Sequence, residues 1–310
     1  MPLKSSPFST IILAAGKSKR MFSRSSKILF KILGKPMIQF VVDIAHSVNS
    51  DEIIVVVGKD GREIKKILGP EIKYATQTVP KGTGDATRVG IDIAKNPYIL
   101  ILYGDVPLLK KETIEAMIAN HFNQNADLSV LTCLVSDPSG YGRIIRDRRG
   151  NLIKIIEQVD ASEKELKVRE INTGIYFGAR KIIQDELINL KPDNKQGELY
   201  LTDIVHNLIK KKKNVLGFKI TDEEEILGVN TKFDLARIQE IAKKRWFKEL
   251  MLKGVYIEDP QTTHIDLTVK FGNYVHIRPF TMIEGNTFIK DDSVIGPFTW
   301  IKDGKKKVLK

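Results

Sequence analysis

The chain has 310 residues, 42% of them hydrophobic, which suffices for a globular core and for more than one domain. Its net charge is +12, but 38 acidic residues are mixed with 50 basic ones, and the 7% of aromatic residues do not interleave with a basic stripe. This pattern disfavours a dedicated nucleic-acid-binding protein and is compatible with a protein that binds a small polyanionic substrate. One cysteine excludes an intrachain disulfide framework, and no apolar run approaches the length of a membrane span. We therefore expect a cytoplasmic protein with neither nucleic-acid nor membrane partners.

The first motif follows a short apolar run near the start of the chain. Ile11 to Leu13 predict a buried strand, residues 12–21 read "ILAAGKSKRM", and Pro36 stands at a plausible first position of the next helix. A strand, an irregular loop and a helix in this order direct backbone N–H groups at an anion. The alternative is a basic surface turn, and this stretch alone does not decide between the two.

Short apolar runs alternate with helical patterns as far as about Val229. The runs "DEIIVVVG" and "YILILYGD" are almost continuously apolar, as strands buried on both faces of a parallel sheet are. The alternation predicts a doubly wound α/β domain. A helical pattern then extends from Thr231 to Lys253, and Gly254 is its expected terminator.

The last part of the chain carries a six-residue repeat. Apolar residues recur every six positions, and a small or β-branched residue follows four positions after each of the first five. The two sets are Phe271, Ile277, Ile283, Ile289, Ile295 and Ile301, and Val275, Thr281, Thr287, Ser293 and Thr299. This period predicts a β-helix with three hexapeptides per coil, whereas a β-meander would give a period of two. Five hexapeptides make fewer than two coils, so we expect a stub followed by a solvated basic tail, "KDGKKKVLK".

Polar residues suited to chemistry follow the predicted strands. Asp105 ends "YILILYGD", where ligands bind in open α/β sheets, so its carboxylate is placed to hold a divalent cation; the alternative is a helix N-cap. "QTVPKGTGDA" offers Gln77, whose amide is able to donate to and accept from a uracil edge, and a loop of Gly82, Thr83 and Gly84 whose backbone can approach a flat base. Its glycine spacing fits a dinucleotide-binding fingerprint poorly. "GYGRIIR" supplies glycines that let a sugar approach the backbone, or else an ordinary hairpin turn.

Eight stretches together carry a family resemblance. They are, in chain order, "LAAGKSKRM", "QTVPKGTG", "YGDVPL", "GYGRI", "IIEQVDA", "EINTGIY", "GELYLTDI" and "GVNTKFDLARI". From about Thr10 to Ile301, their order and spacing resemble those of the bacterial bifunctional N-acetylglucosamine-1-phosphate uridylyltransferase/glucosamine-1-phosphate acetyltransferase family. The resemblance implies an α/β fold: a Rossmann-like nucleotidyltransferase domain over 1–230, a linking helix over 231–254, and a short left-handed parallel β-helix with a basic tail over 255–310. This would be a truncated form without most of the acetyltransferase domain, and hence without acetyltransferase activity.

The reaction that the resemblance implies is magnesium-dependent. UTP and N-acetylglucosamine 1-phosphate give pyrophosphate and UDP-N-acetylglucosamine, a precursor of cell-wall peptidoglycan. The attacking phosphate oxygen is already anionic, so the reaction needs cations rather than a general base. Two alternatives stay open: a nucleotidyltransferase for another sugar 1-phosphate, because pocket polarity sets sugar choice, and a catalytically silent regulatory protein that binds nucleotide sugars. By the same resemblance a full-length β-helix favours trimers, and the stub leaves the oligomeric state open, a homo-oligomer included.

The resemblance also assigns roles to individual residues. Two cations neutralise the triphosphate, two oxygen ligands hold Mg²⁺, and the remaining residues bind the nucleotide or the sugar. The cations are Arg20 and Lys27, and the Mg²⁺ ligands are Asp105 and Asn230. The nucleotide-binding residues are Leu13, Ala14, Ala15, Gly16, Gln77, Gly82 and Thr83. The sugar-binding residues are Tyr103, Gly142, Glu157 and Asn172.

The opening loop departs from the family pattern at three positions. Glycine, threonine and proline are usual where this chain has Ser18, Lys19 and Ser26. Ser18 reduces backbone freedom and Lys19 adds charge. Arg20 and Lys27 are retained, so we still expect a loop that holds phosphates.

Overall fold

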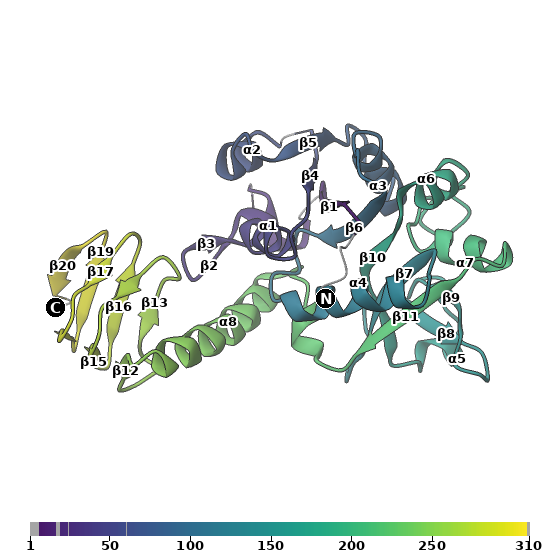
Figure 1. Cartoon of the computed structure of the whole chain (residues 1–310). Coiled ribbons are helices and arrows are strands. Elements are labelled where there is room, and N and C mark those ends of the chain that lie inside the picture. The colour runs from purple at the N-terminus through teal and green to yellow at the C-terminus, as the bar shows by residue number, and fades with distance from the viewer. Residues whose placement is uncertain (1–5, 17–18, 24, 60, 309–310) are drawn as a thin grey trace. The chain divides into compact units, whose positions relative to one another are not determined.

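The computed structural model describes residues 6–16, 19–23, 25–59 and 61–308, so the departure at Ser18 lies outside the described residues (Figure 1). The chain forms two compact units. The first combines Met1–Lys19 with Ile38–Gly228, and the second combines Arg20–Met37 with Val229–Lys310. No helix within the described ranges is long and apolar enough to cross a membrane.

The first unit is built on one mixed sheet. Its strands are β1 (Phe8–Ala14), β4 (Glu52–Val57), β5 (Lys73–Thr76), β6 (Tyr98–Tyr103), β7 (Leu128–Leu134), β8 (Arg143–Arg146), β9 (Leu152–Ile156), β10 (Glu170–Ala179) and β11 (Val215–Ile220). The order is β11-β7-β10-β6-β1-β4-β5, and β8 pairs with both β10 and β9. β1 runs parallel to β4 and β6 and is buried along its whole length, as a central strand of an α/β sheet should be.

Two strands of this sheet, β10 and β9, run against the expected parallel direction. β10 pairs antiparallel with both β6 and β7, while β11 is parallel to β7. The predicted α/β alternation is therefore present, but the sheet is mixed rather than wholly parallel. β10 is buried on both faces, as a central parallel strand is, so its sequence pattern does not indicate that it runs antiparallel.

Helices connect the strands of the first unit. They are α1 (Met37–Ser47), α2 (Arg62–Leu68), α3 (Thr83–Ile91), α4 (Lys111–Asn123), α5 (Glu163–Leu166), α6 (Arg180–Ile188) and α7 (Asp203–Lys210), with a 3-10 turn η3 at Glu223–Ile226. α3 contacts β1 and β4. The sequence suggested Pro36 as the first residue of α1, and this prediction is wrong. Pro36 lies in the short strand β3 (Lys35–Pro36), and α1 begins one residue later.

The second unit contains a long helix, α8 (Lys232–Leu252). Thr231 caps its N-terminus: the Thr231 hydroxyl accepts from the Asp234 N–H at 3.1 Å, and the Asp234 carboxylate accepts from the Thr231 N–H at 2.8 Å. Gly254, with φ of +96°, follows the helix, where a left-handed residue is easily accommodated only by glycine.

Short strands follow α8 and return repeatedly to the same ladders. They are β12 (Tyr256–Ile257), β13 (His264–Ile265), β14 (Lys270–Phe271), β15 (His276–Ile277), β16 (Thr281–Glu284), β17 (Phe288–Ile289), β18 (Val294–Ile295), β19 (Thr299–Lys302) and β20 (Lys305–Val308). Three parallel ladders result: β12-β15-β18, β13-β16-β19 and β14-β17. Figure 1 shows β13, β16, β19 and β20, which are neighbours in one sheet, in colours from yellow-green to yellow.

The six-residue repeat supplies the core of these ladders. Paired residues such as His264 and Met282 are separated in sequence by three repeats, which is one full coil. Ile277, Ile283, Ile289 and Ile301 are buried, and Phe271 and Ile295 pack against them. The end of the chain is solvated as expected, with Lys305 and Lys306 exposed, but residues 305–308 also form β20, antiparallel to β19.

A hairpin from early in the chain also belongs to the second unit. After the 3-10 turns η1 (Lys19–Met21) and η2 (Lys27–Leu29), the strands β2 (Lys31–Ile32) and β3 turn through Leu33 and Gly34. The Leu267 N–H donates to the Leu33 carbonyl at 3.0 Å. A Cβ on Gly34, whose φ is +79°, would lie 2.5 Å from Oδ2 of the buried Asp266. The hairpin thus packs tightly against the segment that follows β13.

Candidate active site

The ends of β1 and β6 create the first part of the site. The Gly104 N–H donates to the Leu13 carbonyl at 3.0 Å, so the turns after the two strands are neighbours. Gly16 is exposed, and a Cβ placed there would meet no atom within 4 Å. Asp105 is half-buried at the end of β6. It does not cap the next helix, because Lys110 occupies the N-cap position of α4; that alternative for Asp105 is wrong.

Gly82 and Thr83 lie in a loop with a restrained backbone. The Gly84 N–H donates to the Leu199 carbonyl, and the Leu199 N–H donates to the Lys81 carbonyl, each at 2.8 Å. A Cβ on Gly82, whose φ is +109°, would lie 2.5 Å from the Leu199 carbonyl oxygen. Only glycine fits such a position, so the loop has a defined shape before any ligand binds.

Gln77 is buried beside this loop, and its amide is fixed by the chain. Its Nε2 group donates to the Gly82 carbonyl at 3.2 Å and to Asp85 Oδ2 at 2.9 Å, while its backbone N–H donates to the Val57 carbonyl. Both amide hydrogens are therefore engaged. Within the described ranges no group donates to Gln77 Oε1, so the amide offers a ligand an acceptor, and not the donor-acceptor pair that the sequence suggested.

Tyr103, Gly142 and Asn172 lie together near the end of β6. The Asn172 N–H donates to the Gly142 carbonyl at 2.9 Å, which places β10 beside the start of β8. Asn172 Oδ1 accepts from the Gly174 N–H at 3.1 Å and from the Tyr176 hydroxyl at 3.2 Å. Because a Cβ on Gly174, with φ of +81°, would lie 2.5 Å from the Tyr103 ring, only glycine lets that ring pack here.

Glu157 completes this group. Its carboxylate accepts from the Thr202 hydroxyl at 3.1 Å, and a Cβ on Gly142 would lie 3.4 Å from Glu157 Oε2. Burial raises the pKa of Glu157, and the nearby carboxylates of Asp203 and Asp160 raise it further. The four residues assigned to the sugar are thus gathered in one place, where their polar atoms suit hydroxyl and amide groups.

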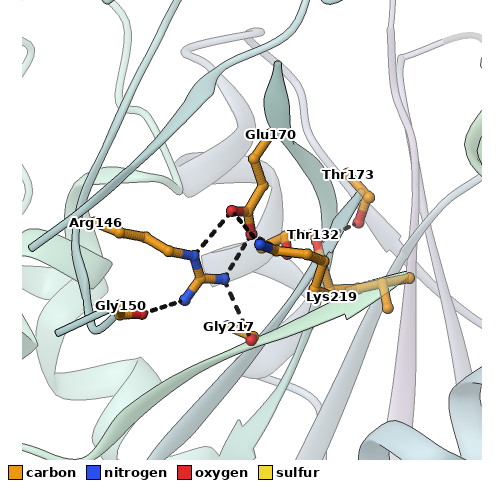
Figure 2. A network of polar contacts seen from close by, with 8 residues as sticks. Thr132, Arg146, Gly150, Glu170, Thr173, Gly217 and Lys219 are labelled. Atoms are coloured by element: carbon orange, nitrogen blue, oxygen red, sulfur yellow. Dashed lines mark hydrogen bonds and ion pairs between the residues drawn. The ribbon is translucent and has the colours of Figure 1, made fainter. Parts of the chain in front are cut away.

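A polar network centred on Glu170 joins four strands (Figure 2). Glu170, two residues before Asn172 on β10, accepts from Arg146 Nε at 2.9 Å, from the Thr132 hydroxyl at 2.7 Å and from Lys219 Nζ at 3.1 Å. Arg146 also donates to the Gly150 and Gly217 carbonyls. The network fixes β10 against β7, β8 and β11, and so supports the sugar residues without being among them.

The predicted phosphate-binding cations lie in the second unit. Arg20 donates from Nη2 to Asn230 Oδ1 at 2.9 Å, and Lys27 Nζ donates to the same oxygen at 3.0 Å. The Asn230 N–H in turn donates to the Asp234 carboxylate at 3.0 Å, which ties the asparagine to the start of α8. Two positive groups that share one neutral oxygen concentrate charge, as a polyanion site requires.

The departure at Ser26 leaves the backbone in a conformation that proline also adopts. Ser26 has φ of −60° and ψ of 139°, and the Leu29 N–H donates to its carbonyl at 3.1 Å. The proline ring locks φ in this same region. Serine at position 26 therefore makes the loop backbone less rigid but leaves its conformation unchanged.

The oxygen ligands expected for magnesium have suitable chemistry. Asp105 offers a carboxylate and Asn230 an amide oxygen, the hard donors that Mg²⁺ takes in small number together with substrate phosphates and water. Within the described ranges no group of three or more histidine, cysteine, aspartate or glutamate residues is arranged to hold a metal ion. Asn230 Oδ1 accepts from two cations here, so it must exchange at least one of them to bind a metal.

Several residues of the site were not identified from the sequence. Asp85, Gly174 and Thr202 lie inside or beside the recognised motifs, but their partners are distant in the chain. The signal for Gly174 was a glycine within an otherwise continuous strand pattern.

Comparisons with known proteins identify the family of the chain. The family model described as "Nucleotidyl transferase" matches residues 9–247. The "Bifunctional protein GlmU" of Caldanaerobacter subterraneus subsp. tengcongensis is 40% identical over 295 residues, covering 95% of this chain and 64% of that protein. The protein of the same name from Thermosipho africanus is 43% identical over 297 residues, covering 96% and 64%. This chain therefore spans 64% of the length of these curated relatives.

Two solved structures share the fold. A UDP-glucose pyrophosphorylase complexed with UDP-glucose matches with a TM-score of 0.65 and 18% identity, over 77% of this chain and 99% of that one. A putative glucose-1-phosphate thymidylyltransferase from Bacillus anthracis, in complex with a sucrose, matches with a TM-score of 0.63 and 24% identity, over 76% and 95%. At these identities the likeness shows the fold alone.

Proposed function

The chain belongs to the nucleotidyl transferase family, with its Rossmann-like α/β fold, and we propose that it transfers the uridylyl group of UTP to N-acetylglucosamine 1-phosphate, releasing pyrophosphate. The motif resemblance implies this reaction, and relatives about 40% identical over nearly the whole chain bear the name "Bifunctional protein GlmU". One observation carries the proposal furthest: Tyr103, Gly142, Glu157 and Asn172, assigned to the sugar by resemblance, come from separate segments and yet lie together.

The proposed chemistry is attack by a phosphate oxygen of the sugar 1-phosphate on the α-phosphorus of UTP. No side chain has to remove a proton, because the nucleophile is already ionised. Arg20 and Lys27 neutralise the triphosphate and the charge that develops on the leaving pyrophosphate. Gln77 Oε1 accepts from the base, while the Gly82 loop contacts its plane.

A divalent cation is part of the proposal. Mg²⁺ would neutralise phosphate oxygens and so favour the approach of two anions. Asp105, at the end of β6, is one proposed ligand. Asn230 is the other ligand that the resemblance implies, and its oxygen already faces the groups that would bind phosphates.

We also propose the domain organisation that the sequence suggested. A nucleotidyltransferase domain covers 1–230, a linking helix 231–254, and a left-handed parallel β-helix with its basic end 255–310. The parallel ladders, whose paired residues are three repeats apart in sequence, and their buried isoleucines support a β-helix with three six-residue sides per coil. Arg20–Met37 groups with the C-terminal residues as a compact unit, so the first boundary in sequence is not a boundary of contacts.

The test is pyrophosphate release from UTP with a panel of sugar 1-phosphates, with and without Mg²⁺. We expect release with N-acetylglucosamine 1-phosphate that EDTA abolishes. Faster release with another sugar 1-phosphate would assign a different acceptor. Binding of UDP-N-acetylglucosamine without turnover on any acceptor would instead identify a silent regulatory protein and overturn the enzymatic proposal.

A further inference from the structure

The orientation of the Gln77 amide is set by a residue without an assigned role. Asp85, on the first turn of α3, is 6% exposed. Its Oδ2 accepts from Gln77 Nε2 at 2.9 Å, and its Oδ1 accepts from Arg88 at 2.8 Å. A carboxylate only accepts hydrogen bonds, so the nitrogen of the neighbouring amide must face it.

We infer that Asp85 is a positioning residue that selects the pyrimidine by holding Gln77 with its oxygen toward the base. This inference rests on the proposed function, because it assumes that the base lies against Gln77. The Gly82 carbonyl takes the second Nε2 hydrogen, and both acceptors thus favour the same orientation. Reversal of the amide, with its oxygen and nitrogen exchanged, would bring Oε1 against Asp85 Oδ2 and leave two acceptors facing each other in a buried place.

The selected orientation distinguishes bases by one hydrogen. Uracil carries a hydrogen on N3 and donates it to an oxygen acceptor, whereas N3 of cytosine carries a lone pair and would meet Gln77 Oε1 as a second acceptor. A reversed amide would have the opposite preference, because Nε2 would then donate to cytosine N3. The choice of base therefore depends on Asp85 as well as on the glutamine that touches the ligand.

A purely structural role for Asp85 makes a different prediction. An aspartate in the first turn of a helix stabilises that helix by its charge, and its loss would lower stability or turnover equally for every nucleotide. Only a role in positioning Gln77 changes the ratio between nucleotides.

The experiment compares Asp85→Asn with Arg88→Gln. Asp85→Asn keeps the size but lets residue 85 donate as well as accept, so only the Gly82 carbonyl still favours the wild-type orientation of the Gln77 amide. Arg88→Gln removes the other partner of Asp85 and keeps the acceptor for Gln77. Two ratios are measured for each protein: kcat/KM for UTP over CTP, and the dissociation constant of CDP over that of UDP by calorimetry.

We expect Asp85→Asn to lower both ratios about tenfold or more, and Arg88→Gln to leave them within about twofold. Gln77→Met removes the amide without touching Asp85; it should lower the ratios to a similar extent, and adding Asp85→Asn to it should change them no further. If Asp85→Asn does not fold, Asp85→Ser, which also lets residue 85 donate as well as accept, is measured in its place.

Unchanged ratios in Asp85→Asn, or additive effects in the double variant, overturn the inference. The binding measurement separates this failure from a failure of the proposed reaction. If the wild type binds UDP in preference to CDP but turns over no substrate, the proposed reaction fails while the effect of Asp85 is still measured. If the wild type shows no preference between UDP and CDP, the inference itself is wrong.

Discussion

Replacing Glu170 by glutamine perturbs the polar network of Figure 2 at its centre. Glu170 is 7% exposed and takes hydrogen bonds from Arg146, Thr132 and Lys219. Glutamine is almost the same size, but it removes the negative charge and turns one acceptor into a donor that faces cationic groups. The substitution therefore isolates the charge from the packing.

The expected magnitude follows from the burial of each partner. Breaking a fully buried ion pair costs about 3–5 kcal/mol, whereas an exposed pair contributes about 0–1 kcal/mol. The side chain of Arg146 is 21% exposed and that of Lys219 is 46% exposed, so water screens the lysine and reaches part of the arginine. We expect Glu170→Gln to lower the unfolding free energy at pH 7 by about 2 kcal/mol.

The same contacts give the effect a dependence on pH. Burial alone would raise the pKa of Glu170, but the hydrogen bonds from Arg146, Thr132 and Lys219 outweigh it and hold the pKa below its ordinary value of 4.5. A carboxylate with a depressed pKa in the folded state stabilises fully above its unfolded pKa, and the stabilisation disappears as pH falls through the folded value. The difference between wild type and variant should be constant above about pH 5.5 and shrink at lower pH.

Urea unfolding followed by circular dichroism, at intervals from pH 3 to pH 8, measures this difference. Asp185→Asn is the control, because it makes the same chemical change in an exposed pair with Lys181 and should cost no more than about 0.5 kcal/mol. Because Asn172 follows on the same strand, we also expect Glu170→Gln to raise KM for the sugar 1-phosphate more than KM for UTP. A loss no greater than that of the control, or one that persists unchanged at pH 3, would refute the reasoning.

Three further substitutions test other parts of the structure. Asp105→Asn should lower turnover about a hundredfold or more and weaken the dependence on Mg²⁺, with unfolding unchanged; wild-type rates across a magnesium titration would contradict its role as a ligand. Arg20→Ala should reduce kcat about a thousandfold, because the cation near Asn230 is lost, and near-normal steady-state rates would remove Arg20 from the mechanism. Gly34→Ala should destabilise the second unit by about 2–4 kcal/mol, since it adds a left-handed alanine and a clash with Asp266; an unchanged melting temperature would show that the hairpin can move away.

The features that could be predicted from the sequence are those with a local period or motif. The spacing of six identified Ile277, Ile283 and Ile289 as buried before any contact was known, because a repeat places equivalent side chains on the same side of each coil. The apolar runs in β4 and β6 likewise predicted central parallel strands. Each of these patterns is contained in a few neighbouring residues.

The features that could not be predicted depend on contacts between distant segments. Nothing in the sequence near Glu170 identifies Lys219 as its partner, and the direction of β10 follows from how the chain returns to the sheet. The amide of Gln77 was expected to donate to a base and to accept from it. The sequence does not reveal that the amide nitrogen instead donates to Asp85. The charge of the tail predicted its exposure but not its secondary structure, because exposed lysines are compatible with an edge strand such as β20.

The division of the second unit between the two ends of the chain has a consequence for synthesis. Arg20 precedes its partner Asn230 by 210 residues, and at about 5–20 residues per second the ribosome needs about 10–40 s to make the intervening chain. Throughout that interval Leu33 has no Leu267 to bond, and Ile32, fully buried in the finished protein, lacks the C-terminal part of its unit. A nascent chain halted before residue 229 therefore leaves Ile32 and Leu33, both buried in the finished protein, without the C-terminal part of their unit.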